Sequence, residues 1–141
     1  MKYLGVFLVL LGFSTLHAQE ITDYDLRNFA FSYKEMMRLN TEAQNEMAKL
    51  ISDAKLDLDT YHIIDQSKDS DYIPDFSESD FEKYNSIQPK IEKIQKQLEE
   101  RFENVLKRND LDKQKYRAIA ERVQHDYILQ NKLDRILASL P

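Results

Sequence analysis

Apolar side chains recur every three or four residues along the first half of the chain, after residue 22. This spacing aligns them on one face of an α-helix. It predicts a long helix from Asp23 to Asp53, capped by Thr22 or Asp23. Part of the stripe returns every seven residues, which is typical of a helix that packs along another helix. The stripe consists of Leu26, Phe29, Ala30, Tyr33, Met36, Met37, Asn40, Ala43, Met47, Leu50 and Ile51.

The same spacing returns in the second half and predicts another long helix, which begins at Ser77 or Ser79. Pro89 lies inside this pattern, and an interior proline costs about 3 kcal/mol because it lacks the N–H that the helix needs. We therefore expect a kink or a break at residues 85–89, with Ser86 as the cap of a restarted helix. The stripe consists of Phe81, Tyr84, Ile87, Ile91, Ile94, Leu98, Phe102 and Val105.

Three shorter helices are expected beside the long ones. Asp57 and Asp112 stand where they can cap two of them, and the first of these ends near Ser67. A C-terminal helix is expected at about residues 126–140. The segment 67–79 is rich in serine and acidic residues and contains a proline, so we interpret it as a linker.

The two halves match each other when the sequence is shifted by 55 positions without a gap. A fixed long period is typical of paired or stacked supersecondary units. The alternative is that any two amphipathic helices in phase would match, but the match continues past the first helix into the next segment. We therefore predict a tandem repeat. The matched identities are Asp25/Asp80, Leu56/Leu111, Asp57/Asp112, Tyr61/Tyr116, Ile64/Ile119 and Asp71-Tyr72-Ile73/Asp126-Tyr127-Ile128.

The predicted fold class is all-α: two tandem helical repeats form a helical bundle with two long antiparallel helices and shorter flanking helices. Repeat one spans about residues 21–73, repeat two spans about residues 76–128, and a pseudo-two-fold axis relates the long helices. Residues 19–141 are enough for a single compact domain that contains both repeats and the C-terminal helix.

The first residues have the layout of a secretory signal peptide. Lys2 provides a basic start, Tyr3 to Leu16 is almost entirely apolar, and Ala18 supplies a small residue for cleavage. We predict a signal peptide at residues 1–18, cut after Ala18, and a protein that is periplasmic or secreted. The alternative is a retained anchor, but a run of about 14 residues is short of the roughly 20 that a spanning helix needs. No stable membrane insertion is expected after cleavage.

Composition narrows the function classes. Both glycines, Gly5 and Gly12, lie in the signal segment. The rest of the chain therefore lacks phosphate-binding glycine loops, dinucleotide fingerprints and the glycine-flanked nucleophile elbow. The chain contains no cysteine, so no disulfide can stabilise it. A net charge of −5 without a basic stripe argues against nucleic-acid binding.

Candidate chemistry is sparse. His62 and His125 have no metal-ligand spacing, and we place them at the surface. A calcium loop in the acidic segment would need oxygen ligands where Ile73 and Pro74 stand. We interpret the acidic residues as linker, surface and cap residues and predict no catalytic, cofactor-binding or metal-binding residue and no enzymatic activity. These acidic residues are Asp65, Asp69, Asp71, Asp75, Glu78 and Asp80, with the pairs Asp57/Asp59 and Glu99/Glu100.

A set of short motifs links the chain to a known family. The motifs are Ile21-Thr22-Asp23, Phe29-Ala30, Glu42-Ala43-Gln44, and Leu56-Asp57 before Tyr61 and Ile64. They resemble the bacterial exported family called domain of unknown function 4168. The resemblance covers most of the chain after the signal segment, although Ser32 stands where the family usually has alanine and Gln97-Leu98 replaces the second Glu-Ala. It implies an exported all-helical protein and supplies no activity and no functional residues.

The methionines and aromatic residues of the first long helix are predicted to pack in the core. These residues are Phe29, Phe31, Tyr33, Met36, Met37 and Met47. The alternative is an adaptable apolar groove, which methionine suits. Phe31 falls off the stripe and becomes a candidate partner contact if it is exposed.

We therefore expect an exported, non-enzymatic protein that acts in protein–protein interaction or as a structural module. Its partner is an unknown protein or a second copy of itself. The alternative function is a carrier of an apolar small molecule in a groove between the long helices. A third possibility is cation buffering by the acidic linker.

Overall fold

The computed structural model describes residues 20–67 and 76–141. Within these residues the chain forms five α-helices and no strand, which confirms the all-α prediction. The predicted signal peptide and residues 68–75 of the predicted linker lie outside the described residues. The helices are α1 (Asp23–Asp53), α2 (Leu58–Ser67), α3 (Glu78–Arg108), α4 (Lys113–His125) and α5 (Tyr127–Ser139).

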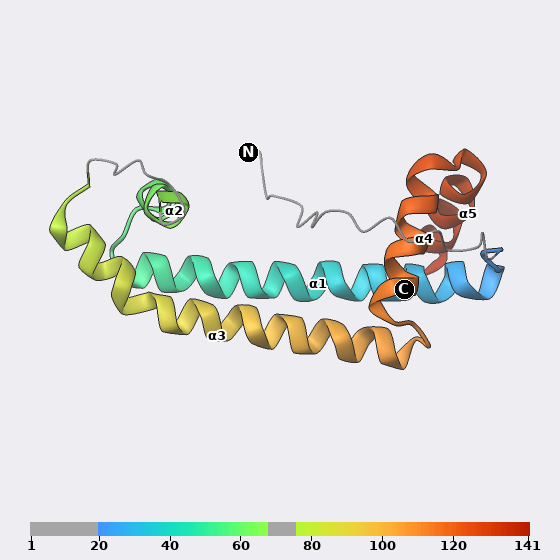
Figure 1. The fold of residues 1–141 in the computed structure, drawn as a ribbon, viewed down its shortest axis with the longest axis horizontal. Helices are drawn as coiled ribbons and strands as arrows, with labels where there is room; N and C mark the ends of the chain where they lie inside the picture. The colour runs from blue at the N-terminus through green and yellow to red at the C-terminus, as the bar shows by residue number, and fades with distance from the viewer. Residues whose placement is uncertain (1–19, 68–75) are drawn as a thin grey trace.

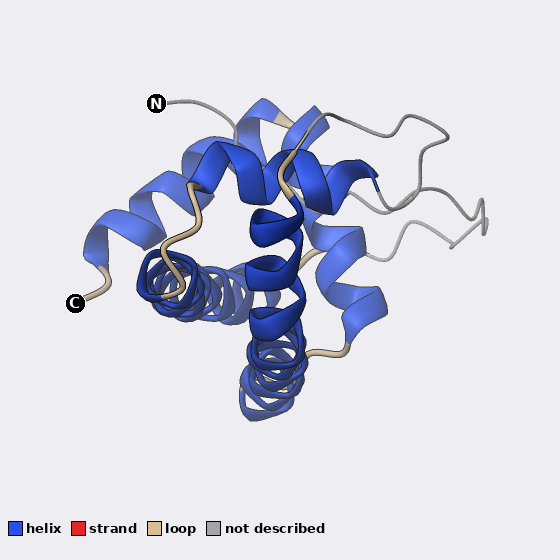
Figure 2. Ribbon diagram, turned by 90° about the vertical axis from the view of Figure 1, so that its left-hand side faces the viewer, coloured by secondary structure: helices blue, strands red, loops and turns tan. Residues whose placement is uncertain are grey.

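The long helices α1 and α3, of 31 residues each, lie side by side and run in opposite directions (Figure 1). Helix α2 packs at the end where α1 finishes, and α4 and α5 pack at the end where α1 begins (Figure 1). Figure 2 looks along the long pair from the end that carries α2 and shows the shorter helices grouped around it. The predicted bundle, with two long antiparallel helices and shorter flanking helices, is confirmed.

The apolar core is divided between the two ends of this pair. The first core joins the beginning of α1 and the end of α3 to α4 and α5. The second core joins the end of α1 and the beginning of α3 to α2. The buried residues of the first core are Leu26, Phe29, Ala30, Leu106, Leu111, Ile119 and Leu133. Those of the second core are Ile51, Leu56, Tyr61, Ile64, Tyr84, Ile87 and Ile91.

Each core contains an aromatic contact between one long helix and the short helix that follows the other long helix. The rings of Phe29 and Tyr116 stack with 4.7 Å between their centroids. The rings of Tyr61 and Tyr84 lie 5.3 Å apart in the second core. Phe29 and Tyr84 are 55 positions apart, and so are Tyr61 and Tyr116. The cores therefore use equivalent positions of the two halves, while a tandem-repeat origin stays a prediction.

The long helices also begin in the same way. The Thr22 hydroxyl accepts a hydrogen bond from the Asp25 backbone N–H at 3.1 Å, and the Asp25 carboxylate accepts one from the Thr22 N–H at 3.1 Å. This is a capping box. Ser77 caps α3 by accepting from the Asp80 N–H at 3.1 Å. The predicted caps of both long helices are thus confirmed, and they too are 55 positions apart.

Both long helices end in the same turn. Lys55 and Asp110 have φ values of 54° and 52°, in the left-handed region that usually carries glycine after a helix. The N–H groups of Lys55 and Leu56 donate to the carbonyls of Ser52 and Ile51, at 2.9 and 3.2 Å. The same two bonds recur after α3, and this pair of bonds defines the Schellman motif. The turn carries each chain from a long helix into the next short helix.

The predicted kink or break at residues 85–89 does not occur as a break, because α3 continues through Pro89. Asn85 and Pro89 are both exposed, so the Asn85 carbonyl that loses its helical partner can be solvated. Ser86 does not cap a restarted helix, because its hydroxyl donates to the Lys83 carbonyl at 2.6 Å. The first turns of α3 are inclined to the rest of the helix in Figure 1. Of the two predicted alternatives, the kink is therefore the one that is observed.

A buried polar contact distinguishes the first end from the second. The Ser32 side chain is fully buried, and its hydroxyl accepts a hydrogen bond from the Asn109 amide at 3.0 Å. The positions 55 residues away hold Ile87 and Ala54, which pack in or against the second core. The hydrogen bond satisfies a hydroxyl whose burial would otherwise be costly.

An ion pair connects the cap of α1 to α4. Lys115 Nζ lies 2.5 Å from Asp25 Oδ1, and the Asp25 side chain is 13% exposed. The hydrogen bond from Lys115 is the main cause that lowers the pKa of Asp25 below its ordinary value, and the bonds from Thr22 act in the same direction. Asp25 therefore stabilises both the start of α1 and its contact with α4.

We expect the substitution Lys55→Gly to stabilise the protein by about 0.5–1 kcal/mol, because glycine adopts a positive φ without the steric cost of a Cβ atom. Urea unfolding of residues 19–141 measures this difference. Asp110→Gly is the matched comparison. Its gain in the free energy of unfolding should be smaller, because the substitution also removes the 2.7 Å hydrogen bond from the Tyr24 hydroxyl to Asp110 Oδ2. A loss of stability in Lys55→Gly would contradict the assignment of strain to this residue.

We expect Asp25→Asn to lower the free energy of unfolding near pH 7 by about 1 kcal/mol. Because the folded-state pKa of Asp25 is lowered, its contribution is complete above the unfolded-state pKa of about 4 and is lost as the pH falls through the folded-state pKa. The difference between the two proteins should therefore shrink below about pH 4, as urea unfolding at several pH values would show. Lys115→Met leaves the capping box intact, so it should lower the free energy of unfolding by less than Asp25→Asn does.

Candidate functional site

The middle of α1 exposes two residues that the sequence placed in the core. Tyr33 is 40% exposed and Met37 is 51% exposed, so the prediction of core packing is wrong for both. It is confirmed for Phe29, which is buried, and Met36 and Met47 are partly buried against the first and second cores.

The position of the short helices explains this exposure. Residues four apart on a helix lie on the same face, so Tyr33 and Met37 point the same way. Helices α4 and α5 pack near the beginning of α1, in the core that Met36 borders, and α2 packs near its end, so Tyr33 and Met37 lie at the edge of the first core and not inside it (Figure 1). We call the resulting surface the α1 ledge. It consists of Tyr33, Met36, Met37, Asn40 and Gln44.

The α1 ledge is anchored in the first core by a series of aromatic rings. The Tyr33 ring stacks on Phe29 with 6.2 Å between centroids, and Phe29 stacks in turn on Tyr116. Burial raises the pKa of Tyr116 to about 12, so its phenol stays neutral near pH 7. The contact with Phe29 thus restricts the position of the Tyr33 ring.

The α1 ledge carries no charged side chain, although 32% of the residues in the chain are charged. Asn40 and Gln44 are half-buried and lie on the same face as Tyr33 and Met37. Asn40 is the amide member of the predicted stripe. An apolar centre with uncharged polar neighbours is the composition of a small protein interface.

Phe31 is exposed, with 42% of its surface accessible, so the prediction of core packing is wrong for this residue too. Residues two apart on a helix point to nearly opposite sides, so Phe31 does not belong to the α1 ledge. Charged residues surround it along the helix, including Arg27, Lys34 and Glu35. A single exposed aromatic ring among charges is common on protein surfaces and carries less weight than the ledge.

A second exposed apolar pair lies where α4 meets α5. Tyr127 is 75% exposed and Ile128 is 70% exposed. Asp126 caps α5 at this turn, because its carboxylate accepts hydrogen bonds from the N–H groups of Ile128 and Leu129 at 2.9 and 3.1 Å.

Among the acidic candidates that the structure describes, Asp57, Asp65, Asp80 and Glu99 have structural partners. Asp65 accepts hydrogen bonds from the Tyr84 hydroxyl at 2.6 Å and from Gln88 at 3.2 Å. Burial, together with the bond to Asp65, raises the pKa of Tyr84. Asp57 caps α2, and Asp80 binds Ser77 and Lys83. Asp69, Asp71 and Asp75 lie outside the described residues.

The other candidates are dispersed. His62 and His125 are both exposed, as predicted, and they belong to different helices. Glu99 forms an ion pair with Lys113 at 3.4 Å. Residues 20–67 and 76–141 contain no group of three or more histidine or acidic side chains placed to hold a metal ion. Among the same residues, no helix combines the length and the apolar character needed to cross a membrane.

One comparison with known proteins gives a match. A family model described as "Domain of unknown function (DUF4168)" matches residues 22–133, which include the whole α1 ledge. No curated protein and no solved structure matches the chain.

Proposed function

Because the chain belongs to the family described as domain of unknown function (DUF4168), whose description names no activity, we propose a function from its surface. We propose that the protein is a non-enzymatic interaction module that associates with a second copy of itself through the α1 ledge. The observation that carries this proposal is the exposure of Tyr33 and Met37 on a face of α1 that is buried at both of its ends.

The chemistry of the α1 ledge suits a second copy. Two copies related by a two-fold axis present the same patch to each other, so the patch must be compatible with itself. An uncharged apolar patch meets this condition, because it brings no like charges together. The spacing of Tyr33, Met37, Asn40 and Gln44, at intervals of four, three and four residues, is the spacing of a helix–helix seam. Asn40 provides an amide that can donate to and accept from its own copy.

The strength of this association should be modest. The α1 ledge consists of five residues on a single helix, which is less than the 20–30 residues per side of a typical stable interface. Methionine adapts its shape to the opposing surface, and a held tyrosine ring supplies contact area at low entropy cost. We therefore expect a dissociation constant on the order of micromolar or weaker.

The carrier function finds less support. The sequence placed its groove between the two long helices, but apolar side chains fill that contact. Leu39, Ala43 and Ile94 are each buried, with at most 6% of their surface exposed. No described feature of α1 or α3 favours a bound apolar molecule over this packing.

Export is part of the proposal. The basic start, the apolar run and the small residue Ala18 support a signal peptide at residues 1–18, which would deliver the domain to the periplasm or beyond it.

Self-association predicts that the weight-average mass of residues 19–141 rises with concentration in light scattering. Met37→Glu should weaken the association at least tenfold, because it places a like charge at the centre of the symmetric contact. Phe31→Glu is the matched control: the residue has similar exposure on the opposite side of the same helix, and its substitution should leave the association unchanged. A constant monomer mass, or equal weakening by both substitutions, would refute the proposal.

Signal cleavage predicts a defined N-terminus. When the full chain is expressed in a Gram-negative host, intact-mass measurement of the periplasmic fraction should give a protein that begins at Gln19. Replacing Leu8 by Arg, in the middle of the apolar run, should keep the uncut precursor in the cytoplasm. An uncut wild-type protein in the membrane fraction would indicate a retained anchor instead.

A further inference from the structure

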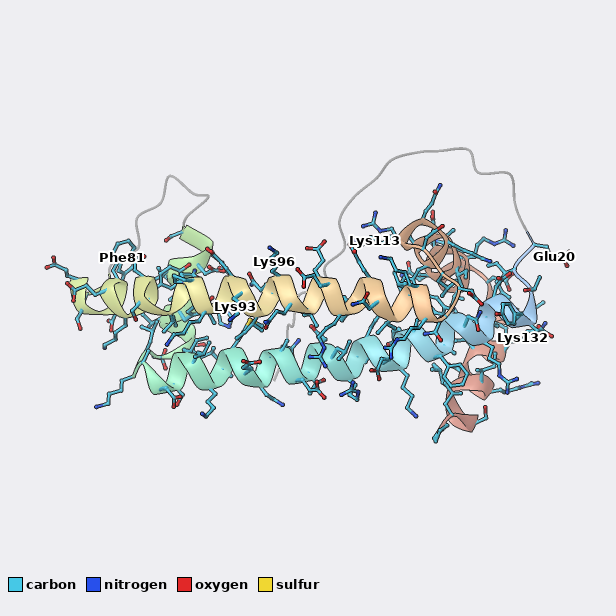
Figure 3. The ribbon with its side chains drawn as sticks, turned by 90° about the horizontal axis from the view of Figure 1, so that it is seen from below. Glu20, Phe81, Lys93, Lys96, Lys113 and Lys132 are labelled. Atoms are coloured by element: carbon cyan, nitrogen blue, oxygen red, sulfur yellow. The ribbon has the colours of Figure 1, made fainter. Side chains whose placement is uncertain are left out.

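A cleft of about 300 Å³ lies between the first turns of α1 and the middle of α5. Asp23 and Arg27 line it from α1, and Lys132, Arg135 and Ile136 line it from α5. Figure 3 shows Lys132 beside the N-terminal end of α1. The cleft is distinct from the α1 ledge, because Arg27 and Tyr33 are six residues apart and their side chains leave the helix in different directions.

The charges that line this cleft do not cancel. Lys132 Nζ forms an ion pair with Asp23 Oδ1 at 3.0 Å. Neither Arg27 nor Arg135 forms a hydrogen bond or an ion pair with any residue that the structure describes. Arg27 and Arg135 therefore line one cleft without a partner carboxylate among the described residues, in a protein whose net charge is −5.

We propose that this cleft binds a small phosphate-type oxyanion. A guanidinium presents its N–H donors in a planar fork that matches two oxygens of a phosphate. Arginines on two different helices allow a tetrahedral dianion to bind both guanidinium groups at once. A single carboxylate is less suited to this, because it has only two oxygens. A volume of about 300 Å³ is at the lower end of ligand pockets and suits a small ligand.

The geometry also identifies which residues set the affinity. Arg27 and Arg135 are the groups that hold the anion. Ile136 contributes an apolar wall, and Lys132 is engaged by Asp23. Asp23 opposes the anion, because it brings the one negative charge among the lining residues. Its removal frees Lys132 to act as a third donor.

The test is the titration of residues 19–141 with inorganic phosphate and with sulfate, at constant ionic strength set by sodium chloride, followed by isothermal calorimetry and thermal unfolding. Phosphate should bind the wild-type protein and raise its Tm, because a ligand that binds only the folded state stabilises it. The double substitution Arg27→Gln, Arg135→Gln should weaken phosphate binding at least tenfold. Asp23→Asn should strengthen it.

The matched control is Lys93→Gln, Lys96→Gln, which removes the same charge from exposed positions of α3 (Figure 3). This variant should bind phosphate as the wild type does. Circular dichroism should show unchanged helicity in the arginine variant, because both side chains are exposed and unpaired. The proposal is overturned if phosphate does not bind, if chloride raises the Tm equally, or if the arginine and lysine variants lose binding to the same extent.

Discussion

The antiparallel contact between α1 and α3 is the interaction on which the other elements depend. Because the helices run in opposite directions, each begins where the other ends (Figure 1). The short helix that follows one long helix therefore reaches an aromatic ring near the start of the other, which gives the contacts of Phe29 with Tyr116 and of Tyr61 with Tyr84. Separation of the long helices would disrupt both cores, so the two ends of the molecule stabilise each other.

The two ends have equivalent helix caps, turns and aromatic contacts, but they differ in which residues are buried and which are exposed. Leu26 is almost fully buried in the core that α5 completes, whereas Phe81, 55 positions later, is 43% exposed beside Phe76. Tyr33 and Met37 correspond to Gln88 and Glu92. The apolar ledge therefore exists on α1 and not at the equivalent positions of α3. The candidate functional surface arises from a difference between two halves whose long helices have equivalent bounds and cap positions.

Both proposed sites depend on α1, but they differ in their relation to the family. The α1 ledge lies wholly within the matched residues 22–133. Arg135 lies beyond the end of that match, so the cleft between α1 and α5 depends partly on a residue outside the matched segment. The ledge is therefore a feature to seek across the family, whereas the cleft is argued for this chain alone.

The sequence by itself determined the helices, their caps and the separation between the halves, because helix periodicity and capping are local properties that neighbouring residues decide. Thr22, Ser77 and Asp112 begin helices as predicted. Only the tertiary structure decided which apolar residues remain exposed. Tyr33 and Met37 have the spacing of core residues, and whether a helix covers them depends on where α2, α4 and α5 pack, which periodicity does not contain. Arg27 and Arg135 are more than one hundred residues apart in the sequence, and they line the same cleft only because α5 packs against α1.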